Sequence, residues 1–137
     1  MAHSISITIK NDVAELGRLC QEVDKFCAIE NLPDETVYTV NLVLEEMITN
    51  TIKYGYSDTA EHQIEVKLSW ENDELTIAIS DDANEFNPLN LPAVDTTKTI
   101  DERGIGGLGI HLVRKLMDHL EYRRENGRNL FLARKRI

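Results

Sequence analysis

The chain has 137 residues, of which 42% are hydrophobic and 28% are charged, and its formal net charge is −9. This length and composition predict one globular domain over residues 1–137 that buries a core of its own. The acidic balance argues against direct nucleic-acid binding, which needs clustered Lys and Arg. Because no apolar run approaches membrane-spanning length and the first residues show no signal-peptide pattern, we expect a cytoplasmic protein without membrane contact.

An amino-terminal strand and a helix are predicted by a change in hydrophobic spacing. Three isoleucines alternate with polar residues over 5–9, which is typical of a strand with one buried face. Asp12 and Glu15 then match a capping box, in which Asp12 accepts the backbone N–H of Glu15. Apolar residues follow at helical spacing as far as Ile29, namely Val13, Leu16, Leu19, Val23 and Phe26.

A second helix is predicted from about 35 to 54, and Gly55 is placed to end it in the left-handed conformation. Its most informative feature is polar. Glu46, Asn50 and Lys53 follow at i, i+4 and i+7, so a carboxylate, an amide and an ammonium group share one face. Such a face is either an ordinary solvated surface or part of a polar site.

Two alternating segments in the middle of the chain predict an antiparallel hairpin, over 63–70 and from 75 onward. The second strand leads to Asp81, a carboxylate where a strand gives way to a loop. That position suits contact with a ligand, although Asp is also an ordinary turn residue. From 88 to 103 the chain has two prolines and no periodicity, which favours a functional loop such as a lid over a ligand.

The stretch 104–109 is the strongest single feature of the sequence. Four of its six residues are glycines, namely Gly104, Gly106, Gly107 and Gly109. Apolar residues at helical spacing, Leu108, Leu112, Val113 and Leu116, predict that a helix follows at once. A glycine loop that opens a helix presents unpaired N–H groups at the positive end of the helix dipole, where phosphate binds. A flexible turn before a packed helix explains an isolated glycine cluster equally well.

The last two strands are joined by an Asn-Gly turn at 126–127, which completes the order strand, two helices, two strands, loop, helix, two strands. Alternation in nearly every strand predicts an α/β (α+β) fold. We expect a two-layer sandwich in which a mixed, mostly antiparallel sheet is covered on one face by helices.

Three segments together resemble the anti-sigma-factor serine kinases, a family of the Bergerat-fold, histidine-kinase-like ATPases. They are 44–50 through Lys53, 81–88 and 104–118, and their order and spacing carry the resemblance. The resemblance implies the Bergerat fold and an ATP-dependent serine-protein kinase that uses Mg²⁺. It also implies partner switching in transcription control, with phosphorylation of a STAS-type anti-anti-sigma protein, binding of a sigma factor, and a homodimer formed through the sheet.

The same resemblance implies a role for each matched residue. Glu46 matches the general base, and Asn50 matches the residue whose side-chain oxygen holds Mg²⁺ against the phosphates. Asp81 matches the carboxylate that accepts the exocyclic amine of adenine, in a loop that also contains Ala83 and Phe86. The nucleotide-binding set is completed by Lys53, Gly104, Gly106, Gly107, Leu108 and Gly109.

The adenine loop departs from the family pattern at two positions. Ala83 stands where glycine is common, and Glu85 stands where glycine or proline is common. If residue 83 needed a positive φ, its Cβ would cost about 1–2 kcal/mol and weaken nucleotide binding by roughly 5- to 30-fold. A second hypothesis therefore remains, a non-catalytic interaction module of the same fold with weak or lost nucleotide binding.

Overall fold

The structure is a computed structural model that describes residues 3–90 and 107–137. The helical segments are η1 (Val13–Glu15), α1 (Leu16–Ile29), α2 (Asp34–Tyr54), η2 (Pro88–Asn90) and α4 (Gly107–Leu116). The strands are β1 (His3–Lys10), β2 (Gln63–Glu71), β3 (Glu74–Asp81), β4 (His119–Glu125) and β5 (Arg128–Arg136). None of the helices within these ranges is long and apolar enough to cross a membrane.

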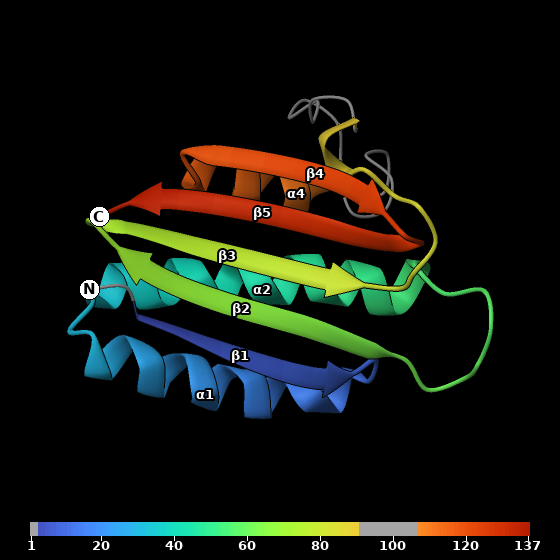
Figure 1. Cartoon of the computed structure of the whole chain (residues 1–137), viewed down its shortest axis with the longest axis horizontal. Helices are drawn as coiled ribbons and strands as arrows, with labels where there is room; N and C mark the ends of the chain where they lie inside the picture. The colour runs from blue at the N-terminus through green and yellow to red at the C-terminus, as the bar shows by residue number, and fades with distance from the viewer. Residues whose placement is uncertain (1–2, 91–106) are drawn as a thin grey trace.

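The described strands form one five-stranded sheet in the order β1-β2-β3-β5-β4 (Figure 1). Each pairing in it is antiparallel. The carboxy-terminal hairpin folds back so that β5 pairs with β3, and in this register Asp81 lies opposite Asn129. The end of β3 and the beginning of β5 therefore lie side by side at one end of the sheet, in its interior strands.

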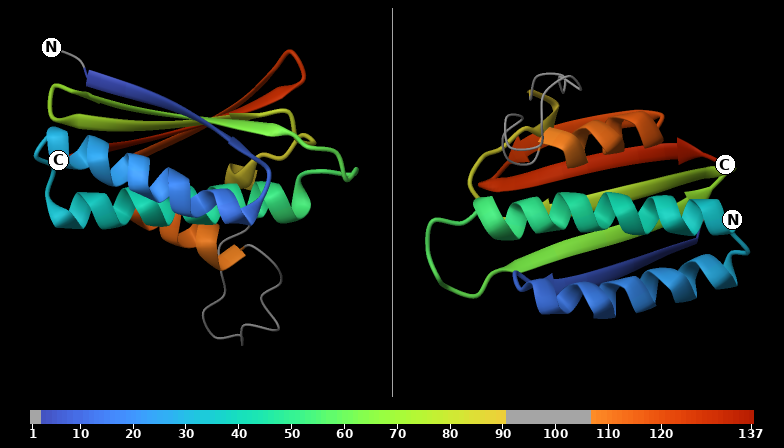
Figure 2. Two further views of the ribbon diagram at one scale, coloured as in Figure 1. Left: turned by 90° about the horizontal axis from the view of Figure 1, so that it is seen from below. Right: turned by 180° about the vertical axis from the view of Figure 1, so that it is seen from behind.

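The helices α1, α2 and α4 cover one face of the sheet, and α2 lies between the other two (Figure 2). The opposite face is not covered by any of the described helices. This arrangement confirms the predicted two-layer sandwich. The predicted mixed sheet is refined, because the pairings within the described residues are antiparallel throughout.

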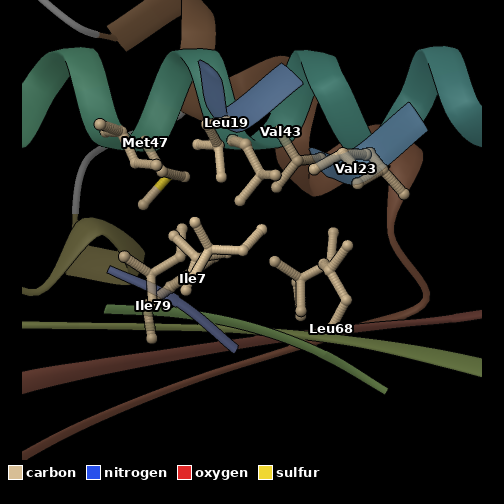
Figure 3. Packing of buried hydrophobic residues seen from close by; sticks show 14 of the residues in the cluster. Ile7, Leu19, Val23, Val43, Met47, Leu68 and Ile79 are labelled. Atoms are coloured by element: carbon tan, nitrogen blue, oxygen red, sulfur yellow. The ribbon is translucent and has the colours of Figure 1, made fainter. Parts of the chain in front are cut away.

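The core lies between the helices and the covered face of the sheet. It is formed by the apolar residues that recur at helical spacing and at every second strand position. Figure 3 shows side chains from both layers in contact, with Leu19, Val23, Val43 and Met47 on the helices and Ile7, Leu68 and Ile79 on the strands. Val43 and Met47 of α2 belong to the same core cluster as Ile79 of β3, so core packing fixes the position of α2 relative to β3.

The start of the first helix differs from the predicted capping box. Asp12 Oδ1 accepts the backbone N–H of Ala14, 3.0 Å away, and not that of Glu15. A 3-10 turn follows, so the α-helix begins at Leu16, and Val13 is 49% exposed rather than packed. Leu112 of α4 was likewise expected to pack, but it is 37% exposed.

The prediction of a left-handed Gly55 is wrong, because this residue has φ −84° and ψ −20°. Residue 55 must be glycine for a different physical reason, which is close packing. A Cβ on Gly55 would lie 2.6 Å from the backbone oxygen of Thr51 and 2.9 Å from the Cβ of Ala83. The end of α2 and the segment after β3 can therefore touch only because residue 55 has no side chain.

His62 ties the segment between α2 and β2 to the end of β3. Its Nε2 lies 2.7 Å from Asp58 Oδ1, its Nδ1 lies 3.1 Å from Asp82 Oδ2, and its ring stacks on Tyr56 with centroids 4.3 Å apart. The hydrogen bonds to Asp58 and then to Asp82 raise the pKa of His62, and the hydrogen bond from His62 lowers the pKa of Asp58.

The contacts of His62 with Asp58 and Asp82, called the His62 clasp below, predict that the free energy of unfolding depends on pH. Because the folded-state pKa of His62 is raised above its unfolded value, its stabilisation is fully present below about pH 6.5 and is lost as pH rises through the raised pKa. We expect the urea midpoint of the wild type to fall relative to that of His62→Gln between about pH 6 and pH 8.5. His119→Gln, at an exposed position of β4, is the matched control and should follow the wild type. Parallel curves for the wild type and His62→Gln would show that the clasp contributes nothing.

Candidate functional site

A pocket of about 340 Å³ opens where β3 ends, between α2, the start of α4 and the β4–β5 hairpin. It combines an apolar lining with a few convergent polar groups, which is typical of a small-molecule site. Its lining residues on α2 and just after it are Met47, Asn50, Thr51, Tyr54 and Gly55. Those on the strands and α4 are Ile79, Asp81, Ile110, Tyr122, Asn129 and Phe131, and those after β3 are Ala83, Asn84, Glu85, Phe86 and Pro88.

Asp81 is the buried carboxylate of this pocket, with 4% of its surface exposed. Its Oδ1 accepts the Ala83 N–H at 3.1 Å and the Asn129 side-chain amide at 2.9 Å. Burial raises the pKa of Asp81, and these two hydrogen bonds oppose the rise. Within the described part of the chain Oδ2 has no hydrogen-bond partner. It is therefore the oxygen that can accept a donor from a ligand.

The two departures in the loop after Asp81 leave this arrangement intact. Ala83 is buried and is not among the residues with positive φ, so its Cβ carries no left-handed strain. The conditional cost expected at this position therefore does not apply. Glu85 is exposed and lines the pocket, and Phe86, which is 46% exposed, lines the same pocket.

The carboxylate of Glu46 is in direct contact with the start of α4. A Cβ on Gly109, the third residue of that helix, would lie 2.0 Å from Glu46 Oε2 and 2.9 Å from its Cδ. Only glycine leaves room for the carboxylate at this place. The first N–H groups of a helix have no partner within the helix and favour negative charge, so this end of α4 suits both Glu46 and an anionic ligand.

Asn50 lies one turn beyond Glu46 on α2 and lines the pocket. Among residues 3–90 and 107–137 its buried amide nitrogen has no hydrogen-bond partner, which is costly unless a ligand or water satisfies the group. The same amide offers a hard oxygen of the kind that Mg²⁺ binds. Residues 3–90 and 107–137 contain no group of three His, Cys, Asp or Glu side chains placed to hold a metal. Mg²⁺ often takes one or two protein ligands and completes its shell with phosphates and water.

The remaining residues predicted to bind the nucleotide are Lys53, Gly104, Gly106, Gly107 and Leu108. Lys53 is exposed and does not line the pocket, so its role stays a prediction. Gly104 and Gly106 lie outside the described residues, as does most of the predicted lid. Gly107 and Leu108 are the first two residues of α4.

Three residues at the site were not predicted from the sequence. Asn129 of β5 hydrogen-bonds Asp81, while Tyr122 and Arg124 of β4 hydrogen-bond Asn129. The available signal was the alternation of β5, in which Asn129 shares the inward face with Phe131 and Ala133. A polar residue in an otherwise apolar inward series marks a buried hydrogen-bonding position.

Comparison with known proteins identifies a family and several relatives. Residues 9–135 match the family model of the histidine kinase-like ATPase domain. The chain is similar to the serine-protein kinase RsbW of Listeria monocytogenes, with 22% identity over 135 residues that cover 96% of this chain and 85% of the relative. It is similar to RsbW of Bacillus pumilus, with 26% identity covering 75% and 70% of the two chains.

A third relative, RsbW of Bacillus velezensis, is 23% identical over 97 residues, which cover 68% of this chain and 61% of that protein. The match to the family model extends over nearly the whole chain, and the sheet and its helical layer agree with it. The chain therefore belongs to the histidine kinase-like ATPase domain family.

Proposed function

We propose that this chain is an ATP-dependent serine-protein kinase that acts as an anti-sigma regulatory factor. The observation that carries the proposal is that Asn50 and Asp81 line one pocket, and that within the described residues the buried Asn50 amide nitrogen has no hydrogen-bond partner. Glu46 is not among the lining residues, but it lies one helical turn before Asn50 on α2 and contacts the start of α4 at Gly109. A base, a metal ligand and a purine acceptor are what phosphoryl transfer from ATP requires, because catalysis rests on positioning and charge stabilisation.

In this proposal the adenine amine donates a hydrogen bond to Asp81 Oδ2, and the triphosphate lies toward the start of α4. Asn50 would hold Mg²⁺, which neutralises charge on the phosphates when it is bound. Glu46 accepts the proton of the attacking serine hydroxyl. The serine oxygen forms a bond to the γ-phosphorus while the bond from that phosphorus to the ADP oxygen breaks.

We further propose the partners that the RsbW relatives suggest. The serine would belong to a STAS-type anti-anti-sigma protein, and the unphosphorylated partner would compete with a sigma factor for this chain in the cytoplasm. A homodimer through the sheet is supported by its uncovered face (Figure 2). Leu130 and Leu132 lie on that face, because they alternate with the inward-facing Phe131.

The alternative of a non-catalytic module rested on decay of the adenine loop. The loop shows no such decay at Ala83, since its backbone does not need glycine and its Cβ packs against Gly55. The observations therefore favour the kinase.

The test is to incubate the chain with Mg·ATP labelled at the γ-phosphate and a purified STAS-domain protein. We expect labelled phosphoserine on the STAS protein, and no label after its serines are replaced by alanine. ATP that binds to the chain but yields no phosphoserine on any STAS protein encoded beside it would contradict the kinase proposal.

A further inference from the structure

A hydrogen-bond network behind Asp81 centres on Asn129. The side-chain nitrogen of Asn129 donates to Asp81 Oδ1 at 2.9 Å and to the Asn84 carbonyl at 3.0 Å. Its side-chain oxygen accepts from the Tyr122 hydroxyl at 2.6 Å and from Arg124 Nη1 at 3.0 Å. Asn129 is itself buried, and these four contacts engage both ends of its amide.

The orientation of the Asn129 amide follows from the chemistry of its neighbours. A guanidinium group can donate but never accept, so the amide atom that faces Arg124 is the oxygen. The nitrogen therefore faces Asp81. Because the Ala83 N–H also donates to Oδ1, that oxygen receives two donors and Oδ2 receives none within the described residues.

We propose that Asn129 is a positioning residue that decides which oxygen of Asp81 meets the ligand, and so makes the pocket select a purine with an amine at position 6. The inference rests on the proposed function, in which Asp81 receives that amine. Asn129 lines the same pocket, and in this proposal its effect on the nucleotide passes through Asp81. A donor behind Oδ1 holds the carboxylate in one rotamer, which leaves a single acceptor for the ligand.

Arg124 gives the network a second connection. Its Nη1 also donates to the Ala83 carbonyl at 2.8 Å, so it ties the segment after β3 to β4. The same guanidinium therefore fixes both the Asn129 amide and the backbone beside Asp81. The order of the adenine-binding segment thus depends on the β4–β5 hairpin, which is distant in sequence.

The network also affects the charge of Asp81. Burial raises the pKa of this carboxyl, and the hydrogen bonds from Asn129 and the Ala83 N–H oppose that rise. The other titratable groups near Asp81 are Asp82, Arg128 and Tyr56. An ionised Asp81 is needed to accept the amine, so wild-type ATP affinity should fall as pH drops through the pKa of Asp81.

The decisive variant is Asn129→Asp, which keeps the shape of the side chain but replaces its donor by a carboxylate. Two adjacent carboxylates must share a proton for one of them to donate to Oδ1, and such a pair has a raised apparent pKa. We therefore expect the ATP affinity of Asn129→Asp to fall as pH rises from about 6 to 8.5, a fall that ionisation of Asp81 does not give the wild type. At the upper pH its affinity should be at least about tenfold weaker than that of the wild type.

The measurement is calorimetric titration of the full chain with Mg·ATP and with the triphosphate of purine riboside, which lacks the amine. Asn126→Asp is the matched control, because it adds the same charge at an exposed turn position with φ 52° and should behave as the wild type. Arg124→Met is the second variant. It frees the Asn129 amide to rotate and should lower the preference for ATP about threefold or more.

The outcomes separate this inference from the proposed function. Equal wild-type affinity for the two triphosphates would overturn amine recognition by Asp81, whatever Asn129 does. A wild type that prefers ATP, together with wild-type pH dependence in Asn129→Asp and wild-type preference in Arg124→Met, would overturn the role of Asn129. If Asn129→Asp does not give the wild-type circular dichroism spectrum, Arg124→Met is read instead as a test of the network that Arg124 holds through both Asn129 and the Ala83 carbonyl, and wild-type preference in that variant overturns the role of the network.

Discussion

Replacing Glu46 by glutamine is expected to remove phosphoryl transfer while ATP affinity stays within about threefold of the wild type. Glutamine has the shape of glutamate, so it fits against Gly109, but its amide cannot take the proton of the serine hydroxyl. Loss of a general base costs roughly 10²- to 10⁴-fold in rate. The transfer rate is measured with labelled ATP and the affinity by calorimetry.

Glu45→Gln is the matched control for this variant. Glu45 is exposed on the same helix and the substitution changes the net charge equally, so transfer should be unaffected. Equal losses of transfer and of ATP binding in Glu46→Gln would mean that Glu46 holds the site together and is not the base.

Adding a single methyl group at Gly109 is expected to be almost as damaging to transfer. The Cβ of Gly109→Ala would lie 2.0 Å from Glu46 Oε2, so the carboxylate must turn away. Because a carboxylate is the mobile end of a flexible side chain, we expect little loss of folding stability. Transfer should fall by roughly 10²-fold or more, since the base is displaced from its position.

Gly17→Ala in α1 provides the comparison, because its added Cβ would meet no atom of the described residues within 4 Å, apart from its chain neighbours and the backbone of its own helix. This control should keep full transfer activity and gain roughly 0.5–1 kcal/mol of stability from helix propensity. Combining Gly109→Ala with Glu46→Gln should cost no more than the larger single effect, because both remove the same base. Full transfer in Gly109→Ala would contradict the proposal that Glu46, held against the start of α4, is the base.

The sequence predicted the elements of the fold because each one repeats its apolar residues at a characteristic spacing. Alternation located β1, β2 and β3, the Asn-Gly turn located β4 and β5, and helical spacing located α1, α2 and α4. The order of the strands in the sheet was not predicted in detail, since alternation gives the buried face of a strand but not its neighbour. The pairing of β5 with β3, which places Asn129 opposite Asp81, is visible only in the structure.

Local glycine signals were informative in one place and misleading in another. Gly55 follows a helix, as a left-handed cap would, yet it is required by contact with a residue 28 positions later, Ala83. The need for Gly109 likewise comes from Glu46, on a different helix. Such contacts join distant segments, so a sequence pattern can propose the residue without giving its physical reason.

The central claim is that the pocket beside Asp81 binds adenine nucleotide, and the most direct test is calorimetric titration of the wild-type chain with Mg·ATP and Mg·ITP. The two nucleotides differ at position 6, where ATP has an amine donor and ITP a carbonyl acceptor. An ionised Asp81 has no proton to donate, so its Oδ2 can accept a hydrogen bond from the amine of ATP but cannot donate one to the carbonyl of ITP. We therefore predict that ATP binds at least about tenfold more tightly than ITP. Equal affinities for the two nucleotides, or no binding of ATP, would contradict the account.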